Sequence, residues 1–180
     1  MFHKFITMMI VSSKKRGFTI GESLLLLIVS SLLIFISISF FIRAKEKASQ
    51  KSTMADMHMW AEAIACYISD YSVAPTNPRG VMHYKKPIIK ELSSYLKAIR
   101  IIDCWGNFFW IWTGKDSHQY GIITKSDQEF IISSFGKDGI MDGWKYDPRD
   151  RDSGFFEIKN LKDFENDLVM WNAKFVRCPK

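Results

Sequence analysis

The sequence predicts an α+β fold in which one long N-terminal helix packs on a small antiparallel β-sheet. Three observations support this fold class. Residues 23–42 carry no charge and follow a basic cluster. Apolar residues then recur with helical spacing to about residue 71, and β-branched and aromatic runs separated by turn residues follow after residue 100. We therefore divide the chain into segments 1–17, 18–42, 43–73 and 74–180.

The uncharged run at residues 23–42 is long enough to cross a membrane. As a helix, its 20 residues would extend about 30 Å, which is the thickness of the hydrocarbon core. Residues 1–17 carry basic but no acidic side chains, and basic flanks stay on the cytoplasmic side. We expect a single-pass membrane protein with a cytoplasmic N-terminus and an exported C-terminal part. The alternatives are a secretory signal or a plain anchor, but no A-x-A-like cleavage site follows the run.

The charge and the motif content exclude two classes of function. The net charge of +6 at first suggests a nucleic-acid-binding protein. Four of the 25 basic residues lie in residues 1–17, however, so 21 remain against 19 acidic residues, and we expect no nucleic-acid partner. The four histidines lack metal-ligand spacing, and the sequence has no nucleophile elbow, phosphate-binding loop or C-x-x-C pair. We therefore expect no enzymatic activity.

Residues 43–73 should continue the same helix with one apolar face. No proline or glycine interrupts the chain between Arg43 and Pro75. A free amphipathic helix on the membrane surface is the alternative, but over a hundred residues follow that need a scaffold. The apolar positions are Met54, Met57, Ala61, Ile64 and Ile68, and the expected solvent face carries Lys51, Asp56, Glu62 and Ser69.

In the C-terminal part of the chain, the residue pattern changes from one typical of helices to one typical of β-strands. Pro87 can open a short helix that continues through Ile99. Three β-branched and aromatic runs then predict an antiparallel meander with one face covered by the amphipathic helix. Trp110 and Trp112 alternate along the first run, and this spacing favours packing over a carbohydrate-binding platform. The three predicted strands are residues 108–113, 119–125 and 129–135.

One short segment at the start of the apolar run carries the most specific information. Residues 17–22 read Gly-Phe-Thr-Ile-Gly-Glu, and Glu22 is a lone carboxylate at the edge of an apolar helix, where a charge is costly unless it is paired. This segment resembles the class III signal of type IV pilins and type II secretion pseudopilins. The resemblance implies that a prepilin peptidase cuts after Gly17 and methylates the new amino group of Phe18. Glu22 would then pair with the Phe18 amine of a neighbouring subunit. Gly21 and Ser23 depart from the large apolar residues usual beside that glutamate.

Three later segments resemble the major pseudopilin of type II secretion. They are residues 103–107, 134–139 and 167–172, with Cys104 where the family has proline. The resemblance implies a pilin-like fold and an inner-membrane subunit that joins a periplasmic pseudopilus. Its partners would be further copies of the chain, other pseudopilins, the peptidase and an inner-membrane assembly platform. A type IV pilus subunit serving adhesion, motility or DNA uptake is the alternative, and a binding module at a pilus tip is a third hypothesis.

The stretch after residue 133 is dense in aspartate. Calcium is bound by carboxylates and loop carbonyls, but by spacing alone a solvated acidic loop fits equally well and the EF-hand pattern is absent. The resemblance implies a calcium site that includes Asp138 and Asp167. We add Asp147 as a third candidate ligand. The loop at residues 144–165 is longer than the family's, so the roles of the remaining aspartates, Asp142, Asp150 and Asp152, stay open.

Three cysteines leave one unpaired in any disulfide arrangement. Cys66 falls near the apolar stripe of the long helix and is expected to be a small buried hydrophobe. Cys104 and Cys178 could form a bridge that ties down the C-terminal tail, as in many minor pilins.

Overall fold

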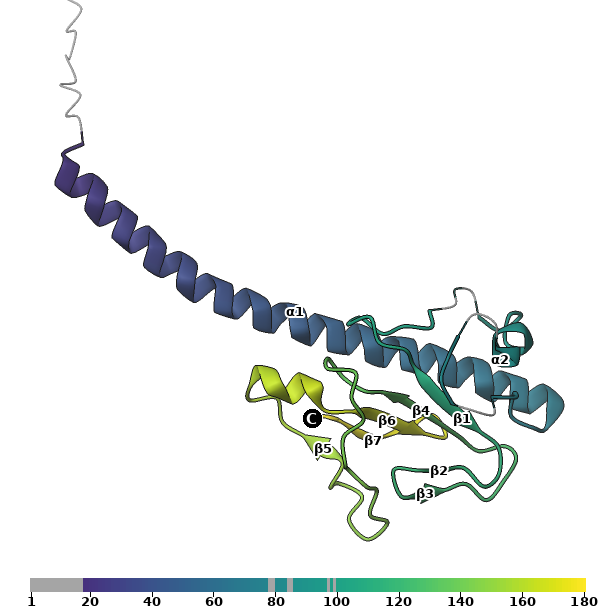
Figure 1. Ribbon diagram of the computed structural model, residues 1–180. Helices are drawn as coiled ribbons and strands as arrows, with labels where there is room; N and C mark the ends of the chain where they lie inside the picture. Colours follow the sequence, from purple (N-terminus) through teal and green to yellow (C-terminus); the bar gives the residue numbers. More distant parts are fainter. Residues whose placement is uncertain (1–17, 78–79, 84–85, 97, 99) are drawn as a thin grey trace, which may run out of the picture. The chain divides into compact units, whose positions relative to one another are not determined.

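The computed structural model describes residues 18–77, 80–83, 86–96, 98 and 100–180 (Figure 1). Gly17 and the rest of the predicted leader lie outside the described residues. The chain separates into two compact units, one ending at Phe41 and the other comprising Ile42–Lys180. Helix α1 runs from Ile20 to Tyr71 as one element of 52 residues, close to the predicted helix. The fold is α+β, with this helix packed against a small mixed sheet.

The first unit contains the N-terminal part of α1. Its apolar side chains are exposed throughout, and the helix is long and apolar enough to cross a membrane. Within the apolar run, the hydroxyls of Ser30, Ser31 and Ser37 each donate a hydrogen bond of 2.7 to 2.8 Å to a backbone carbonyl of the preceding turn. These polar groups are therefore satisfied within the helix, as an apolar environment requires.

The second unit contains a five-stranded sheet with the strand order β1-β4-β6-β7-β5. Neighbouring strands are antiparallel except β5 and β7, which are parallel. The strands β2 and β3 form a separate two-stranded hairpin. The strand bounds are Trp110–Thr113 for β1, His118–Gln119 for β2, Ile122–Ile123 for β3, Phe130–Ser134 for β4, Phe155–Phe156 for β5, Leu168–Trp171 for β6 and Lys174–Pro179 for β7.

The predicted three-stranded meander is wrong in its middle strand. The run at residues 119–125 turns back on itself at Tyr120 and Gly121, both of which have positive φ angles. It therefore forms the β2–β3 hairpin outside the main sheet, and β4 pairs directly with β1. The other neighbour of β4 is β6 from the C-terminal part of the chain, which we did not predict as a strand. All five residues of β4 are buried, because both faces of the strand are covered: Phe130 and Ile132 pack in the cluster that includes α1, and Ile131 packs in a second cluster.

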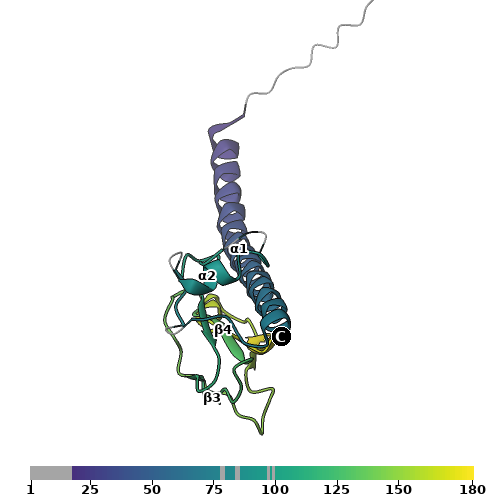
Figure 2. The same ribbon diagram turned by 90° about the vertical axis from the view of Figure 1, so that its right-hand side faces the viewer.

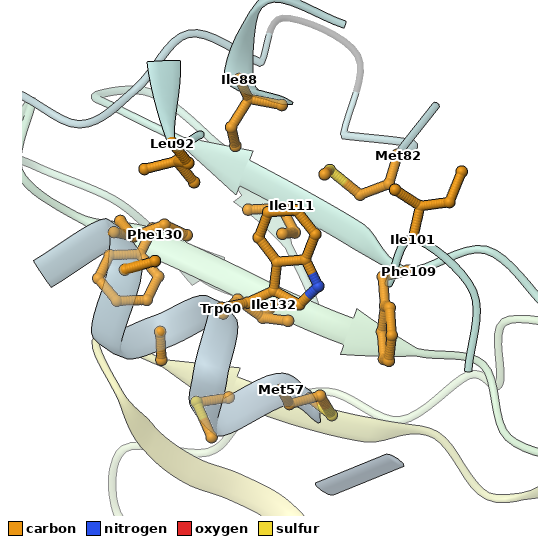
Figure 3. Packing of buried hydrophobic residues seen from close by; sticks show 14 of the residues in the cluster. Met57, Trp60, Met82, Ile88, Leu92, Ile101, Phe109, Ile111, Phe130 and Ile132 are labelled. Atoms are coloured by element: carbon orange, nitrogen blue, oxygen red, sulfur yellow. The ribbon is translucent and has the colours of Figure 1, made fainter. Parts of the chain in front are cut away.

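The core lies between α1 and the sheet (Figure 3). On α1, Met57, Ala61 and Ile64 are buried as predicted, and Met54 and Ile68 are partly buried against the same cluster. They pack with apolar residues of β1, β4 and β6, and with Trp60, which the predicted stripe missed. The further buried members include Phe109, Ile111, Phe130, Ile132 and Met170.

Helix α2, Pro87–Glu91, is shorter than predicted because the chain enters turns from Leu92 instead of continuing to Ile99. Residue 99 lies outside the described residues. The side chains of Ile88 and Leu92 are fully buried in the core. In Figure 2, α2 and β4 lie on the same side of the part of α1 that belongs to the second unit. The short helix therefore extends the cover that α1 gives to this core.

The opposite face of the sheet carries a second, aromatic cluster. Trp110 stacks on Trp112 with ring centroids 5.6 Å apart and on Phe135 at 5.1 Å. Trp112 meets Tyr120 of the hairpin edge-on. The tryptophans therefore pack within the chain, but against the hairpin and not against α1. A Cβ atom on Gly80 would lie 2.2 Å from Trp112, which explains the glycine at this position.

The three cysteines are free thiols in this structure. Cys178 is buried in the core on β7, whereas Cys104 is partly buried beside Arg100. The possible bridge between them is therefore not formed in this structure. Cys66 is exposed, so the expectation of a buried residue is wrong at this position.

Candidate functional site

The start of α1 is built by two residues of the signal-like segment. Thr19 donates to Glu22 Oε2 through its backbone nitrogen at 2.8 Å and through its hydroxyl at 2.9 Å. In return, the backbone nitrogen of Glu22 donates to the Thr19 hydroxyl at 3.2 Å. This reciprocal pattern is a capping box, which satisfies backbone groups that the first helical turn leaves unpaired. The T-x-x-E spacing predicts this start, and our sequence analysis missed it.

The capping box gives Glu22 a local role beside the assembly role that the resemblance implies. Both hydrogen bonds from Thr19 end on Oε2. The other oxygen, Oε1, accepts no hydrogen bond from the described residues. An ionised carboxylate can accept several hydrogen bonds, so Glu22 can hold Thr19 and still pair with an ammonium group. Phe18, which the resemblance makes the mature N-terminus, is exposed directly before it.

Polar residues of α1 form a second feature, which we call the polar seam: Glu46, Thr53 and Asp56. Glu46 is only 7% exposed and accepts hydrogen bonds from Trp105 Nε1 at 2.7 Å and from Lys137 Nζ at 2.8 Å. Burial alone would raise the pKa of Glu46, but the bonds from Lys137 and Trp105 outweigh it and lower the pKa overall.

The rest of the polar seam holds the loop that precedes β1. The Thr53 hydroxyl accepts the backbone nitrogen of Cys104 at 3.2 Å. Asp56 forms an ion pair of 2.9 Å with Arg100. We placed Asp56 on the solvent face, and this was wrong, because the residue is only 6% exposed. Its partner lies 44 positions away in the chain, so helical periodicity alone could not have revealed the contact.

Asp103 connects the segments that carry the family resemblance. Its Oδ1 accepts the backbone nitrogens of Trp105 and Asn107, both at 2.9 Å, and its Oδ2 accepts the Ser134 hydroxyl at 2.7 Å. Burial raises the pKa of Asp103 in spite of these bonds. Asn107 then donates to the carbonyl of Gly136 at 2.8 Å. The segments at residues 103–107 and 134–139 therefore meet at one place.

The third segment joins the same place through the sheet. Ser134 of β4 is paired with Leu168 of β6. At the far end of that strand pair, Asn172 Oδ1 accepts the backbone nitrogen of Phe130 at 3.0 Å.

A Cβ atom on Gly139 would lie 2.6 Å from Asn107 Oδ1. This glycine therefore allows the 134–139 segment to approach the Asn107 side chain closely.

Asp103→Ala should lower the free energy of unfolding by about 3 kcal/mol, because three donors lose their acceptor in a buried place. Asp103→Asn should cost less, since its carbonyl oxygen can still accept the two backbone bonds. Urea unfolding of residues 43–180 measures both effects. Asp127→Ala, an exposed carboxylate, is the matched control and should change little. Equal midpoints for Asp103→Ala and the control would contradict this structural role.

The predicted calcium ligands are only partly brought together. Asp138 and Asp142 line one hollow of about 320 Å³, together with Asp163 and Glu165. Asp167 is fully buried and is linked to this hollow through Asp142, whose backbone nitrogen donates to Asp167 Oδ2 at 3.1 Å. Asp147 lies elsewhere, in an exposed turn where its side chain accepts the backbone nitrogen of Arg149.

Asp167 is the carboxyl group beside this hollow whose pKa is shifted furthest from its ordinary value. Its Oδ2 also accepts the Tyr120 hydroxyl at 2.7 Å, whereas its Oδ1 is buried and has no partner among the described residues. Burial raises the pKa of Asp167 to about 7. Arg177 already supplies a cation here, because it forms an ion pair with Asp142 and lies over the ring of Trp144 at 5.1 Å.

These observations fit a cation site in part. The orphaned Asp167 Oδ1 and the carboxylates of the hollow are the oxygen donors that calcium prefers. No group of three or more His, Cys, Asp or Glu side chains converges on one point within the described residues. A calcium ion would therefore need backbone carbonyls and a movement of Asp138 towards Asp167.

Comparisons with known proteins add no relative. No protein-family model matches the chain, and neither the curated proteins nor the solved structures give a match.

Proposed function

We propose that this chain is a structural subunit of a periplasmic pseudopilus of a type II secretion system. In this proposal it is inserted in the inner membrane through α1, with its N-terminus in the cytoplasm and residues 43–180 in the periplasm. A prepilin peptidase cuts after Gly17, and an inner-membrane platform assembles the product with further copies and with other pseudopilins. The role is structural, with no catalytic step and no nucleic-acid partner.

One observation carries the proposal. A basic cluster is followed directly by the Thr19–Glu22 capping box, and a helix begins there whose next 20 residues carry no charge. Such a helix is suited to pack with copies of itself, in the membrane and in a fibre. Its single carboxylate at the N-terminal edge then sets the register, because an unpaired charge is costly in apolar surroundings.

Calcium belongs to the same proposal as a structural ion of the C-terminal domain. Asp138, Asp142 and Asp167 would hold it, with loop carbonyls completing the coordination. The ion would satisfy the orphaned oxygen of Asp167 and join the 138–142 loop to β6. Asp147 would take part only if its turn moved.

The proposal is tested first by processing. Gly17→Leu should leave the leader attached, because the peptidase cuts beside this small residue, whereas the unaltered chain should begin at a methylated Phe18. Mass spectrometry of the membrane-extracted protein separates the two forms. Gly21→Ala is the matched control and should be cleaved, since a Cβ atom at Gly21 meets nothing within 4 Å. An unaltered chain that keeps residues 1–17 in cells with an active prepilin peptidase would refute the proposal.

A further inference from the structure

A hollow separate from the acidic one opens beside β7. Its volume of about 480 Å³ lies in the range usual for ligand pockets. Two of its aromatic side chains, Phe155 and Phe175, pack on the core beneath α1, whereas Tyr146 and Trp171 belong to the aromatic cluster on the other face of the sheet. The hollow therefore lies where the two faces of the sheet meet at its edge.

This hollow exists because β5 covers only the end of β7. The two strands pair at Cys178 and Pro179 alone, so no strand of the described chain lies beside residues 174–176 on the outer edge of β7. These three residues line one side of the hollow, and Arg151 and Asp152, which precede β5, line the other. An uncovered strand edge carries backbone N–H and C=O groups that can pair with a further strand.

The pairing of β6 shows which backbone groups of β7 face this gap. The backbone nitrogen of Asn172 donates to the carbonyl of Phe130 on β4 at 3.0 Å. Because backbone groups alternate in direction along a strand, those of Trp171 face β7 and those of Met170 face β4. Phe175 pairs with Met170, so its own N–H and C=O point away from β6. Neither group has a hydrogen-bond partner among the residues that the structure describes.

The charges of the hollow favour a ligand with acidic groups. Arg151 and Lys174 line it together with a single carboxylate, Asp152, which leaves one net positive charge. All three side chains are exposed, and none of them forms an ion pair within the described part of the chain. Both cations are consequently available to carboxylates of a ligand, and the arginine can bind one through two parallel hydrogen bonds.

We propose that this hollow binds an extended segment of another protein in which an apolar residue stands between acidic ones. The segment adds a short strand to the edge of β7, and the N–H and C=O of its apolar residue pair with the C=O and N–H of Phe175. Opposite residues share one face of a sheet. The apolar side chain therefore lies beside the rings of Phe155 and Phe175, and an acidic neighbour lies on the face of Lys174.

The free backbone groups identify the occupant as a peptide. A saccharide or a small organic anion could also contact aromatic rings and cations. A peptide in addition supplies one donor and one acceptor at the spacing of a neighbouring strand, which is what Phe175 requires. The binding involves neither cleavage at Gly17 nor polymerisation, so it is independent of the proposed function and is tested apart from it.

Amide NMR of the full chain in detergent micelles, with synthetic peptides as probes, tests the backbone pairing. The peptide acetyl-Thr-Glu-Val-Glu-Thr-amide should shift the amide signal of Phe175 and slow its hydrogen exchange, because the amide gains a partner. The same peptide with an N-methylated valine lacks the central N–H and is the matched control. It should bind about fivefold more weakly, the factor expected for one lost hydrogen bond. Equal binding of the two peptides would overturn the proposal.

Charge reversal tests the preference for acidic segments. A peptide with lysines in place of both glutamates should bind about fivefold more weakly, as expected for the loss of two exposed ion pairs. Lys174→Glu should lose most of this preference. Lys115→Glu, at an exposed lysine that does not line the hollow, should keep it, and unchanged melting curves would confirm that both variants fold. Equal preferences in the two variants would contradict the proposal.

A neutral oligosaccharide, maltohexaose, distinguishes the remaining occupant. It should leave the amide signal of Phe175 unchanged, because it offers no strand backbone. A response to maltohexaose without any response to the glutamate peptide would show a glycan site and would overturn the proposal.

Discussion

Glu22→Gln should be inserted and cleaved normally but should not enter fibres. Glutamine can take the same place in a capping box, so the helix start at Thr19 is preserved. It carries no charge, however, and cannot neutralise the Phe18 ammonium of a neighbouring subunit in apolar surroundings. The uncompensated charge costs several kcal/mol at every subunit contact, which is enough to stop polymerisation. Sheared fibre fractions and the processed mass measure the two outcomes separately.

A second variant separates the two roles of Glu22. Thr19→Ala removes both the hydroxyl that donates to Glu22 and the acceptor of its backbone nitrogen, but it keeps the carboxylate. It should lower helix stability by about 1 kcal/mol and still allow fibres to form. If Glu22→Gln assembled normally while Thr19→Ala failed, the carboxylate would serve only to start the helix.

The stability of residues 43–180 in chelator should fall as the pH rises from about 4 to about 7. The pKa of Asp167 is raised to about 7 by burial, whereas an unperturbed aspartate titrates near 3.9. Between these values the folded state binds more protons than the unfolded state, so the free energy of unfolding decreases with pH. The full difference corresponds to about 4 kcal/mol at most. Asp167→Asn should remove this pH dependence in thermal melts, and a melting temperature that still falls equally in that variant would contradict the assignment.

Calcium should oppose this loss, because it binds the ionised form of Asp167. The melting temperature at pH 7.5 should rise with calcium, by the equivalent of about 2.7 kcal/mol when free calcium is a hundred times its dissociation constant. At pH 5 the gain should be smaller, since protons compete for the same carboxylate. Magnesium should substitute poorly because it requires a tighter octahedral shell.

Asp138→Ala should abolish the calcium effect, whereas Asp147→Ala should leave most of it, because Asp147 lies in a separate exposed turn. Identical melting curves in calcium and in chelator would mark the acidic loop as ordinary solvated surface. That result would also remove one reason for favouring a pseudopilus over a type IV pilus.

The long helix could be predicted from sequence because its signals are local. The absence of charge in residues 23–42 and the spacing of Met57, Ala61 and Ile64 are properties of neighbouring residues. The capping box at Thr19 is equally local and was open to prediction. The polar seam was not, because Asp56 and Glu46 are buried by partners that come from distant loops.

The sheet could be predicted only in part, for a related reason. β-propensity marks residues that suit a pleated, half-buried surface, but it does not say which strands pair. The run at residues 119–125 had the right composition and still left the sheet at Gly121. The second neighbour of β4, beside β1, instead came from residues 168–171. The roles of Asp103 and Asp167 likewise depended on contacts across 31 and 47 positions of the chain.

The polar seam has a mechanical consequence for the second unit. Apolar contacts alone would allow the helix to slide along the domain in small steps, since one methyl group can replace another. Sliding by one turn, about 5.4 Å, would separate Glu46 from Lys137 and Asp56 from Arg100 together. Both carboxylates would then be buried without partners, at a cost of several kcal/mol each. The polar seam therefore fixes the register between this part of α1 and the rest of the second unit. A force along the helix axis is consequently transmitted to the whole second unit at once.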